Sequence, residues 1–203
     1  NYTTIEYGYI YCKSNLIITH SEVRYCNNFG IKLRIDEDDY EDLDEVLELS
    51  IISSSIHDNV YGGIHINEGD IYLAENQIFN NGGGGISTID ENYGDFTLLD
   101  NTIYNNTHGI FVYIENNNGT IIINNNTIFN NTSFGISVEL EDVNSGNIST
   151  INYNNIYNND GVGLFIESGI YEIIGNSIYS NAGNGVVISS NDETFTDISF
   201  NNI

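Results

Sequence analysis

The chain has 203 residues and a formal net charge of −25, from 29 acidic and 4 basic side chains. Nucleic acids and anionic membranes bind basic surfaces, so this charge excludes a nucleic-acid partner and disfavours polyanionic ones. No apolar run is long enough to span a bilayer, and we expect no membrane insertion.

One phrase of about 25 residues recurs along the chain, for example as NTIYNNTHGI, NTIFNNTSFGI and NSIYSNAGNGV. A fixed period of this length predicts stacked structural repeats, with one coil per repeat. We therefore expect a single all-β domain over residues 1–203, a solenoid of about eight coils that forms a segment of a longer array. The central aliphatic anchors of the coils are Val23, Ile56, Ile78, Ile103, Ile128, Ile156, Ile178 and Ile203.

Residues of the same kind recur at fixed distances in sequence from each anchor. Equivalent positions in successive coils form what is here called a column. Short β-branched runs separated by Asn and Gly are typical of strands and turns, and both residues tolerate the left-handed backbone of sharp corners. We predict that aliphatic columns fill the interior and that stacked Asn side chains form ladders. The Asn columns are Asn76, Asn101, Asn126, Asn154, Asn176 and Asn201, and Asn59, Asn81, Asn106, Asn131, Asn159 and Asn181.

The first coils contain the two cysteines of the chain, Cys12 and Cys26. The pair is compatible with a disulfide in an oxidising compartment. It is equally compatible with two small buried thiols. The sequence leaves both alternatives open.

An acidic insertion at about 36–48 follows these coils and lengthens one repeat. Its carboxylates repel one another unless they are solvated or bind cations, so Asp36, Asp38 and Asp39 are candidate calcium ligands. The segment lacks the glycine and ligand spacing of an EF-hand loop, which favours a solvated loop. We expect no cofactor, with calcium as the open alternative.

The strand after the recurrent glycine of each coil presents an outward face. Because side chains alternate along a strand, Glu139 and Glu167 fall in one outward column of adjacent coils, about 5 Å apart. This separation is similar to that of the two carboxylates of a retaining glycosidase, and it also suits calcium. Phe111, Tyr113 and Phe165 offer flat surfaces on which sugar rings could stack. The alternative is two exposed acids beside surface aromatics, without a function.

A second outward column directly follows the anchors and is aromatic in five successive coils. It predicts a stack that stabilises neighbouring coils. A stripe of this length is also a candidate interface with a partner. The column contains Phe79, Tyr104, Phe129, Tyr157 and Tyr179.

Several Asn residues match the pattern for N-glycosylation. Many lie in or beside the predicted ladders, where the amide is needed internally. Asn118 and Asn147, which we expect in loops, are therefore the candidates in an exported protein.

The NxIxxNxxxGI consensus resembles the coils of the right-handed parallel β-helix superfamily, typified by pectate lyases and periplasmic copper-processing proteins. The resemblance covers the chain from about residue 5 onward and implies a right-handed parallel β-helix. It implies little about function, because the superfamily includes lyases, glycoside hydrolases, epimerases, tailspikes and adhesins. The Asn-, Ile- and Tyr-rich composition is also similar to that of archaeal adhesin-like surface proteins.

These observations favour a non-enzymatic extracellular protein, a structural or adhesive segment of a surface or matrix protein. Its partners would be further copies of itself, neighbouring surface proteins or glycans. The alternative is a carbohydrate-active β-helix that binds or hydrolyses glycans through Glu139 and Glu167. A lyase is disfavoured, since uronate elimination requires a basic residue and only Lys32 and Arg34 of the N-terminal coils could supply one on this face. A metal-delivery protein has little support, because the chain lacks Met and its histidines are scattered.

Overall fold

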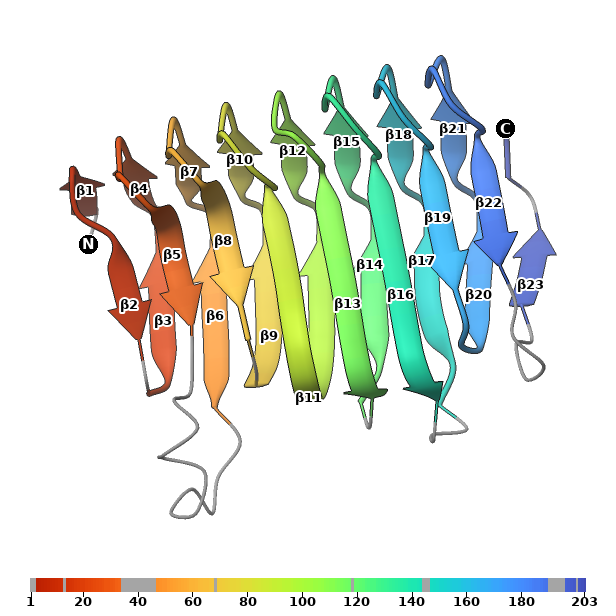
Figure 1. Ribbon diagram of the computed structural model, residues 1–203, viewed down its shortest axis with the longest axis horizontal. Coiled ribbons are helices and arrows are strands. Elements are labelled where there is room, and N and C mark those ends of the chain that lie inside the picture. The colour runs from red at the N-terminus through yellow and green to blue at the C-terminus, as the bar shows by residue number, and fades with distance from the viewer. Residues whose placement is uncertain are drawn as a thin grey trace.

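The computed structural model describes residues 3–12, 14–33, 47–67, 69–117, 119–143, 147–189, 196–199 and 201–203. Every regular element in this part of the chain is a strand, and neighbouring strands run parallel. The coils stack along one axis, so that the two termini lie at opposite ends of the stack (Figure 1). The predicted all-β solenoid of parallel coils is confirmed.

One side of the solenoid is an eight-stranded sheet, here called sheet A, to which each coil contributes one short strand. Neighbouring strands pair with their anchors in register, as Ile78 does with Ile103. The order is β1 (Thr3–Glu6), β4 (Ser21–Arg24), β7 (Ser55–His57), β10 (Gln77–Phe79), β12 (Thr102–Tyr104), β15 (Thr127–Phe129), β18 (Asn155–Tyr157) and β21 (Ser177–Tyr179).

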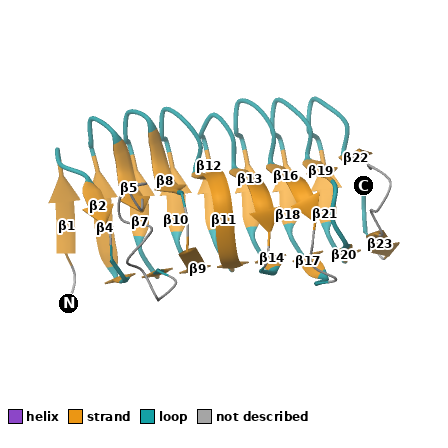
Figure 2. Cartoon of the chain, turned by 60° about the horizontal axis from the view of Figure 1, so that its bottom comes forward, coloured by secondary structure: helices purple, strands orange, loops and turns teal. Residues whose placement is uncertain are grey.

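The other sides form a 15-stranded sheet, here called sheet B, in two rows joined by β11 (Ile86–Leu99), which runs through both (Figures 1 and 2). The first row contains β2 (Ile10–Cys12), β5 (Phe29–Leu33), β8 (Gly62–Ile66), β13 (Ile110–Asn117), β16 (Ile136–Val143), β19 (Leu164–Glu167) and β22 (Val186–Ser189). The second row contains β3 (Leu16–Thr19), β6 (Glu48–Ile52), β9 (Gly69–Ala74), β14 (Ile121–Asn124), β17 (Ser149–Asn152), β20 (Tyr171–Ile174) and β23 (Thr196–Ser199).

The aliphatic columns fill the interior, as predicted. The anchors from Val23 to Ile156 are fully buried, whereas Ile203, the last residue described, is 65% exposed. Each coil supplies only a few apolar side chains to this interior, so a coil has no core of its own. The coils are therefore stable only as a stack.

Both Asn ladders are present, and they connect neighbouring coils through buried amides. In the first ladder, the Asn76 side-chain nitrogen donates to the Asn101 side-chain oxygen at 3.0 Å and to the Ile51 carbonyl at 2.8 Å. The second ladder begins where the Cys26 backbone nitrogen donates to the Asn59 side-chain oxygen at 3.0 Å. Because each amide joins two coils and a corner, the ladders fix the register of the stack.

The left-handed corner residues are the neighbours of the ladder Asn residues. Glu75 (φ 57°) precedes Asn76, and Asn80 (φ 54°) precedes Asn81. The ladder Asn is thus kept for hydrogen bonding, and the preceding residue makes the corner.

The recurrent glycine of each coil is required for space. A Cβ atom at Gly85 would lie 2.6 Å from the Ile103 Cγ2 atom and 2.8 Å from the Gly109 carbonyl oxygen. Real Cβ atoms do not approach other atoms this closely. The glycine column therefore allows the backbones of adjacent coils to come together beside the anchor.

The disulfide alternative for Cys12 and Cys26 is wrong, because both are free thiols. Cys12 ends β2 in sheet B, and its Sγ atom donates to the Ser14 carbonyl at 2.9 Å. Cys26 follows β4 in sheet A and is fully buried, which raises the pKa of its thiol. Cys26 lies in the core and Cys12 packs against it, and each Sγ atom has its own backbone carbonyl partner, Arg24 for Cys26 and Ser14 for Cys12.

Candidate functional site

The outward aromatic column of sheet A forms a continuous stack. Ring centroids of successive coils are 4.9, 4.9, 5.0 and 5.2 Å apart, and the ring planes lie within 6° of one another. The separations match the strand spacing, so each ring lies over the ring of the next coil. The predicted stack is confirmed, and its members are Phe79, Tyr104, Phe129, Tyr157 and Tyr179.

The stack has a further member, His57, which we did not predict. Its imidazole lies 4.5 Å from the Phe79 ring at an angle of 4°. Its ring nitrogens lie 3.0 Å from the Glu22 carboxylate and 2.7 Å from the Asp58 carboxylate. The signal was in the sequence, because His57 directly follows the anchor Ile56 and so occupies the aromatic column.

The geometry of the stack limits what it can bind. Because the faces of neighbouring rings pack against one another, the rings present their edges to solvent. A sugar stacks on the face of an aromatic ring, so this column does not offer a platform for glycans. It leaves instead a flat surface of ring edges and short polar side chains.

The first row of sheet B brings the other predicted residues together on three neighbouring strands. Strands β13, β16 and β19 pair in register, so that Tyr113, Glu139 and Glu167 follow one another in one outward column. Phe111 and Phe165 belong to the adjacent outward column, separated by Ser137. Their predicted roles in glycan contact and catalysis stay predictions.

A hollow of about 370 Å³ opens beside Ser137. Ser137 is much smaller than the phenylalanines on either side of it in the column, and this difference leaves the space. The walls include the Phe134, Val162 and Phe165 side chains and the carboxylate of Glu139. The Ser137 hydroxyl donates to the Glu139 Oε1 atom at 2.9 Å.

Ser87 and Ser137 are buried although their strands turn them outward. At Ser87, the space that corresponds to the hollow beside Ser137 is filled by the imidazole of His108. The His108 Nε2 atom lies 3.3 Å from the Ser87 hydroxyl. Phe134 stacks on His108 at 5.1 Å, and burial lowers the pKa of this imidazole.

Sequence reasoning missed His108 and Phe134, although both directly precede a recurrent glycine. The equivalent residue in an earlier coil is Gly84, where a Cβ atom would lie 2.4 Å from the His108 Nε2 atom. The ring of one coil therefore occupies space that a glycine of the preceding coil leaves free.

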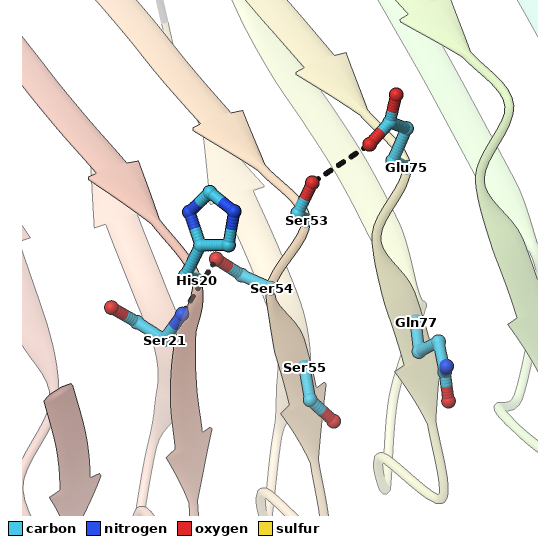
Figure 3. A pocket seen from close by; sticks show the side chains of 7 residues that line it. All are labelled: His20, Ser21, Ser53, Ser54, Ser55, Glu75 and Gln77. Atoms are coloured by element: carbon cyan, nitrogen blue, oxygen red, sulfur yellow. Dashed lines mark hydrogen bonds between the residues drawn. The ribbon is translucent and has the colours of Figure 1, made fainter. Parts of the chain in front are cut away.

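A second hollow, of about 360 Å³, lies at the corner that enters sheet A. Ser54 occupies the position that Asn occupies in later coils, since its backbone nitrogen donates to the Asn76 side-chain oxygen. Its hydroxyl accepts from the Ser21 backbone nitrogen at 3.1 Å (Figure 3). The Ser53 hydroxyl donates to the Glu75 carboxylate at 2.8 Å (Figure 3). Because the carboxylate, and not His20, holds this hydroxyl, the group is not arranged as a Ser–His–acid triad.

The calcium candidates Asp36, Asp38 and Asp39 and the glycosylation candidate Asn118 lie outside the described residues. Asn147 is described and exposed. Within the described ranges, no three His, Cys, Asp or Glu side chains are grouped so that they could hold a metal ion. The same part of the chain contains no helix with the length and apolar character needed to cross a membrane.

The comparisons with known proteins agree with this architecture. A family model described as the right-handed β-helix region matches residues 43–203. No curated protein and no solved structure matches the chain in the corresponding searches. Since the matched residues make up most of the chain and the structure is a parallel β-solenoid, the chain belongs to the right-handed β-helix family.

Proposed function

We propose that this chain is a non-enzymatic structural and adhesive segment of an extracellular surface or matrix protein. Its fold is that of a repeat-protein scaffold. We infer further that copies of the chain associate through the outer face of sheet A, where the aromatic stack lies.

The observation that carries the proposal is the absence of charge from this face. In β10, β12, β15, β18 and β21, no outward side chain is Asp, Glu, Lys or Arg, although the chain has a net charge of −25. Two copies of so acidic a protein repel each other least where the surfaces in contact are uncharged. The outward residues are Gln77, Phe79, Thr102, Tyr104, Thr127, Phe129, Asn155, Tyr157, Ser177 and Tyr179.

The test introduces one carboxylate into this face. We expect the wild-type chain to form dimers or larger assemblies with increasing concentration in sedimentation velocity, and Thr102→Glu to remain a monomer. The control is Thr97→Glu on the second row of sheet B, which makes the same change of charge on a different side. Equal association of both variants would contradict contact through sheet A.

Glycan binding on the first row of sheet B is a second candidate function. The hollow beside Ser137 favours it, because a phenyl ring of Phe165 and the carboxylate of Glu139 lie there together. Retention on immobilised glycans, lost in Phe165→Ala and kept in Tyr72→Ala, would support this candidate. Failure of all tested glycans to retain the wild-type chain would contradict it.

The extracellular location is part of the proposal. Surface labelling of intact source cells with an antibody to this chain should detect it, whereas detection only after lysis would contradict the location. If the source glycosylates Asn, the exposed Asn147 should carry a glycan, and Asn147→Gln should then lower the mass of the secreted chain by that amount.

A further inference from the structure

The hollow beside Ser137 has walls of two unlike kinds. Phe134, Val162 and Phe165 make it apolar, while Glu139 adds a carboxylate to the same space. Glu167 follows Glu139 in register on the next strand, so a second carboxylate stands beside the hollow. We propose that this hollow binds the ammonium group of a small organic cation.

Among the described residues, the only basic side chains, Arg24 and Lys32, lie on N-terminal coils away from the carboxylates of the hollow. All four basic residues lie within the first 34 positions, and none follows. Of these, Lys32 stands on the same face, but β8, β11 and β13 separate its strand β5 from β16. At the strand spacing, that places Lys32 on the order of 19 Å away, beyond a Debye length at physiological salt. Neither described basic residue is close enough to neutralise Glu139 and Glu167, so this pair of carboxylates attracts cations from solution.

The apolar walls decide what kind of cation fits. A divalent metal ion requires several oxygen ligands, and its hydration shell is not satisfied by phenyl rings. An alkylammonium group, in contrast, is attracted by aromatic rings and also gains from burying its methyl or methylene groups. Carboxylates in the same space exclude anions. A neutral sugar could donate hydroxyl groups to Glu139, but it would gain less than a cation does from the net charge of the two carboxylates.

The neighbouring imidazole does not oppose this assignment. His108 stacks on Phe134 at 5.1 Å and lies next to the hollow, and burial lowers its pKa, which favours the neutral ring at neutral pH. The Ser137 hydroxyl, donating to Glu139 at 2.9 Å, orients that carboxylate at the base of the hollow. The site is thus negative and aromatic without a competing positive group beside it.

The experiment compares charged probes with uncharged counterparts, by isothermal titration calorimetry at physiological salt. Choline is paired with its uncharged carbon analogue, and glucosamine with N-acetylglucosamine. We expect choline or glucosamine to bind at least about fivefold more tightly than its neutral counterpart, consistent with a cation–aromatic contact. The two pairs separate a quaternary from a primary ammonium source. Equal binding within both pairs, or no binding of either cation, would overturn the proposal.

Variants then locate the binding. Glu139→Gln should weaken binding of the cation at least about fivefold, and Phe165→Leu at least about threefold. The control Glu48→Gln removes the same charge from an exposed position on β6 in the second row and should leave binding unchanged. If Glu48→Gln weakens binding as much as Glu139→Gln does, the attraction is that of the whole acidic surface and the proposal is wrong.

A measurement on the wild-type chain locates the binding without relying on variants that could fail to fold. In a titration, choline should shift the backbone amide resonances of Ser137 and Val162 at lower concentrations than it shifts those of sheet A. Shifts spread over all coils would contradict a single site. The outcome is independent of association through sheet A, since the hollow lies on the first row of sheet B and a monomer can still bind the probe.

Discussion

A ladder Asn makes four hydrogen bonds with one amide. Asn101 accepts from the Asn76 backbone and side-chain nitrogens at 3.0 Å each, and it donates to the Asn126 oxygen at 3.0 Å and the Leu73 carbonyl at 2.8 Å. No other side chain of this size offers a donor and an acceptor in the same plane. At the scale of the residue, the ladder is therefore intolerant of substitution.

Asn101→Ala should lower the free energy of unfolding by about 3 kcal/mol, because buried partners in two neighbouring coils lose their hydrogen bonds. Asn155→Ala, at a half-buried strand position outside the ladders, is the control and should cost less than about 1 kcal/mol. Urea unfolding followed by circular dichroism measures both. Equal losses would show that the ladder has no special role in stability.

Gly85→Ala tests the close approach of adjacent coils. The added methyl group meets the Ile103 side chain and the Gly109 carbonyl, so we expect a loss of about 1–3 kcal/mol in unfolding free energy. Gly8→Ala is the matched control, because a Cβ atom there meets nothing within 4 Å. The prediction fails if thermal denaturation shows the same change in both variants.

His108 makes stability depend on pH in a defined direction. Burial lowers the pKa of its imidazole, so the folded chain binds this proton less readily than the unfolded chain does. The contribution of the neutral ring is fully present above the unfolded value of about 6.5 and is lost as the pH falls from there toward the folded value.

His108→Phe keeps a ring against Phe134 but removes the titration. Between about pH 7 and pH 5, the unfolding free energy of the wild-type chain should therefore fall relative to that of the variant. Comparing the two chains cancels the titration of the many shared carboxylates. A difference that is constant over this range would contradict the buried, neutral state of His108.

At the scale of the element, a strand of sheet A is only three residues long in most coils and cannot be stable alone. Its neighbours hold it by backbone pairing, by the buried anchor and by the aromatic ring on its outer side. The ring is the part that can be removed without opening the core.

Tyr104→Leu tests the stack at its middle, where the ring lies 4.9 Å from both Phe79 and Phe129. The loss of two ring contacts should cost about 1–3 kcal/mol of unfolding free energy. Tyr72→Leu replaces an exposed tyrosine of β9 outside the stack and should cost much less. If chemical denaturation gives equal costs, the stack would be a surface feature without an energetic role.

Much of the architecture could be predicted because the same sequence features recur in successive repeats. The anchors, the glycine column and both Asn ladders occur in most coils, so each is supported by several coils at once. The register that places Glu139 opposite Glu167 follows from the same alignment. Residues that change from coil to coil, such as Ser137 between two phenylalanines, or His108, carry no such repetition.

The parts that could not be predicted depend on contacts between unlike columns. The hollow beside Ser137 exists because a serine stands between two phenylalanines while Phe134 reaches over it from a corner. The separate partners of Cys12 and Cys26 depend on the surroundings of each thiol in the fold, which spacing alone does not give. Such contacts are set by side-chain directions in three dimensions.

At the scale of the whole molecule, the distribution of charge divides the solenoid into unlike sides. The outer face of sheet A from β10 to β21 has no charged side chain, whereas the first row of sheet B carries Glu139 and Glu167 beside an aromatic hollow. A rod of this kind can use one side for contact between copies and leave another side free for a ligand. The proposed association and the proposed cation site are therefore compatible.

Light scattering over a range of concentrations, with calcium and with a chelator, tests association through sheet A most directly. Because the proposed contact face has no charged groups, we predict a molar mass that rises above 22.6 kDa with concentration and does not change when calcium is removed. A monomer at every concentration would contradict self-association. Assemblies that dissolve on chelation would contradict sheet A as the contact and assign it to the acidic surfaces.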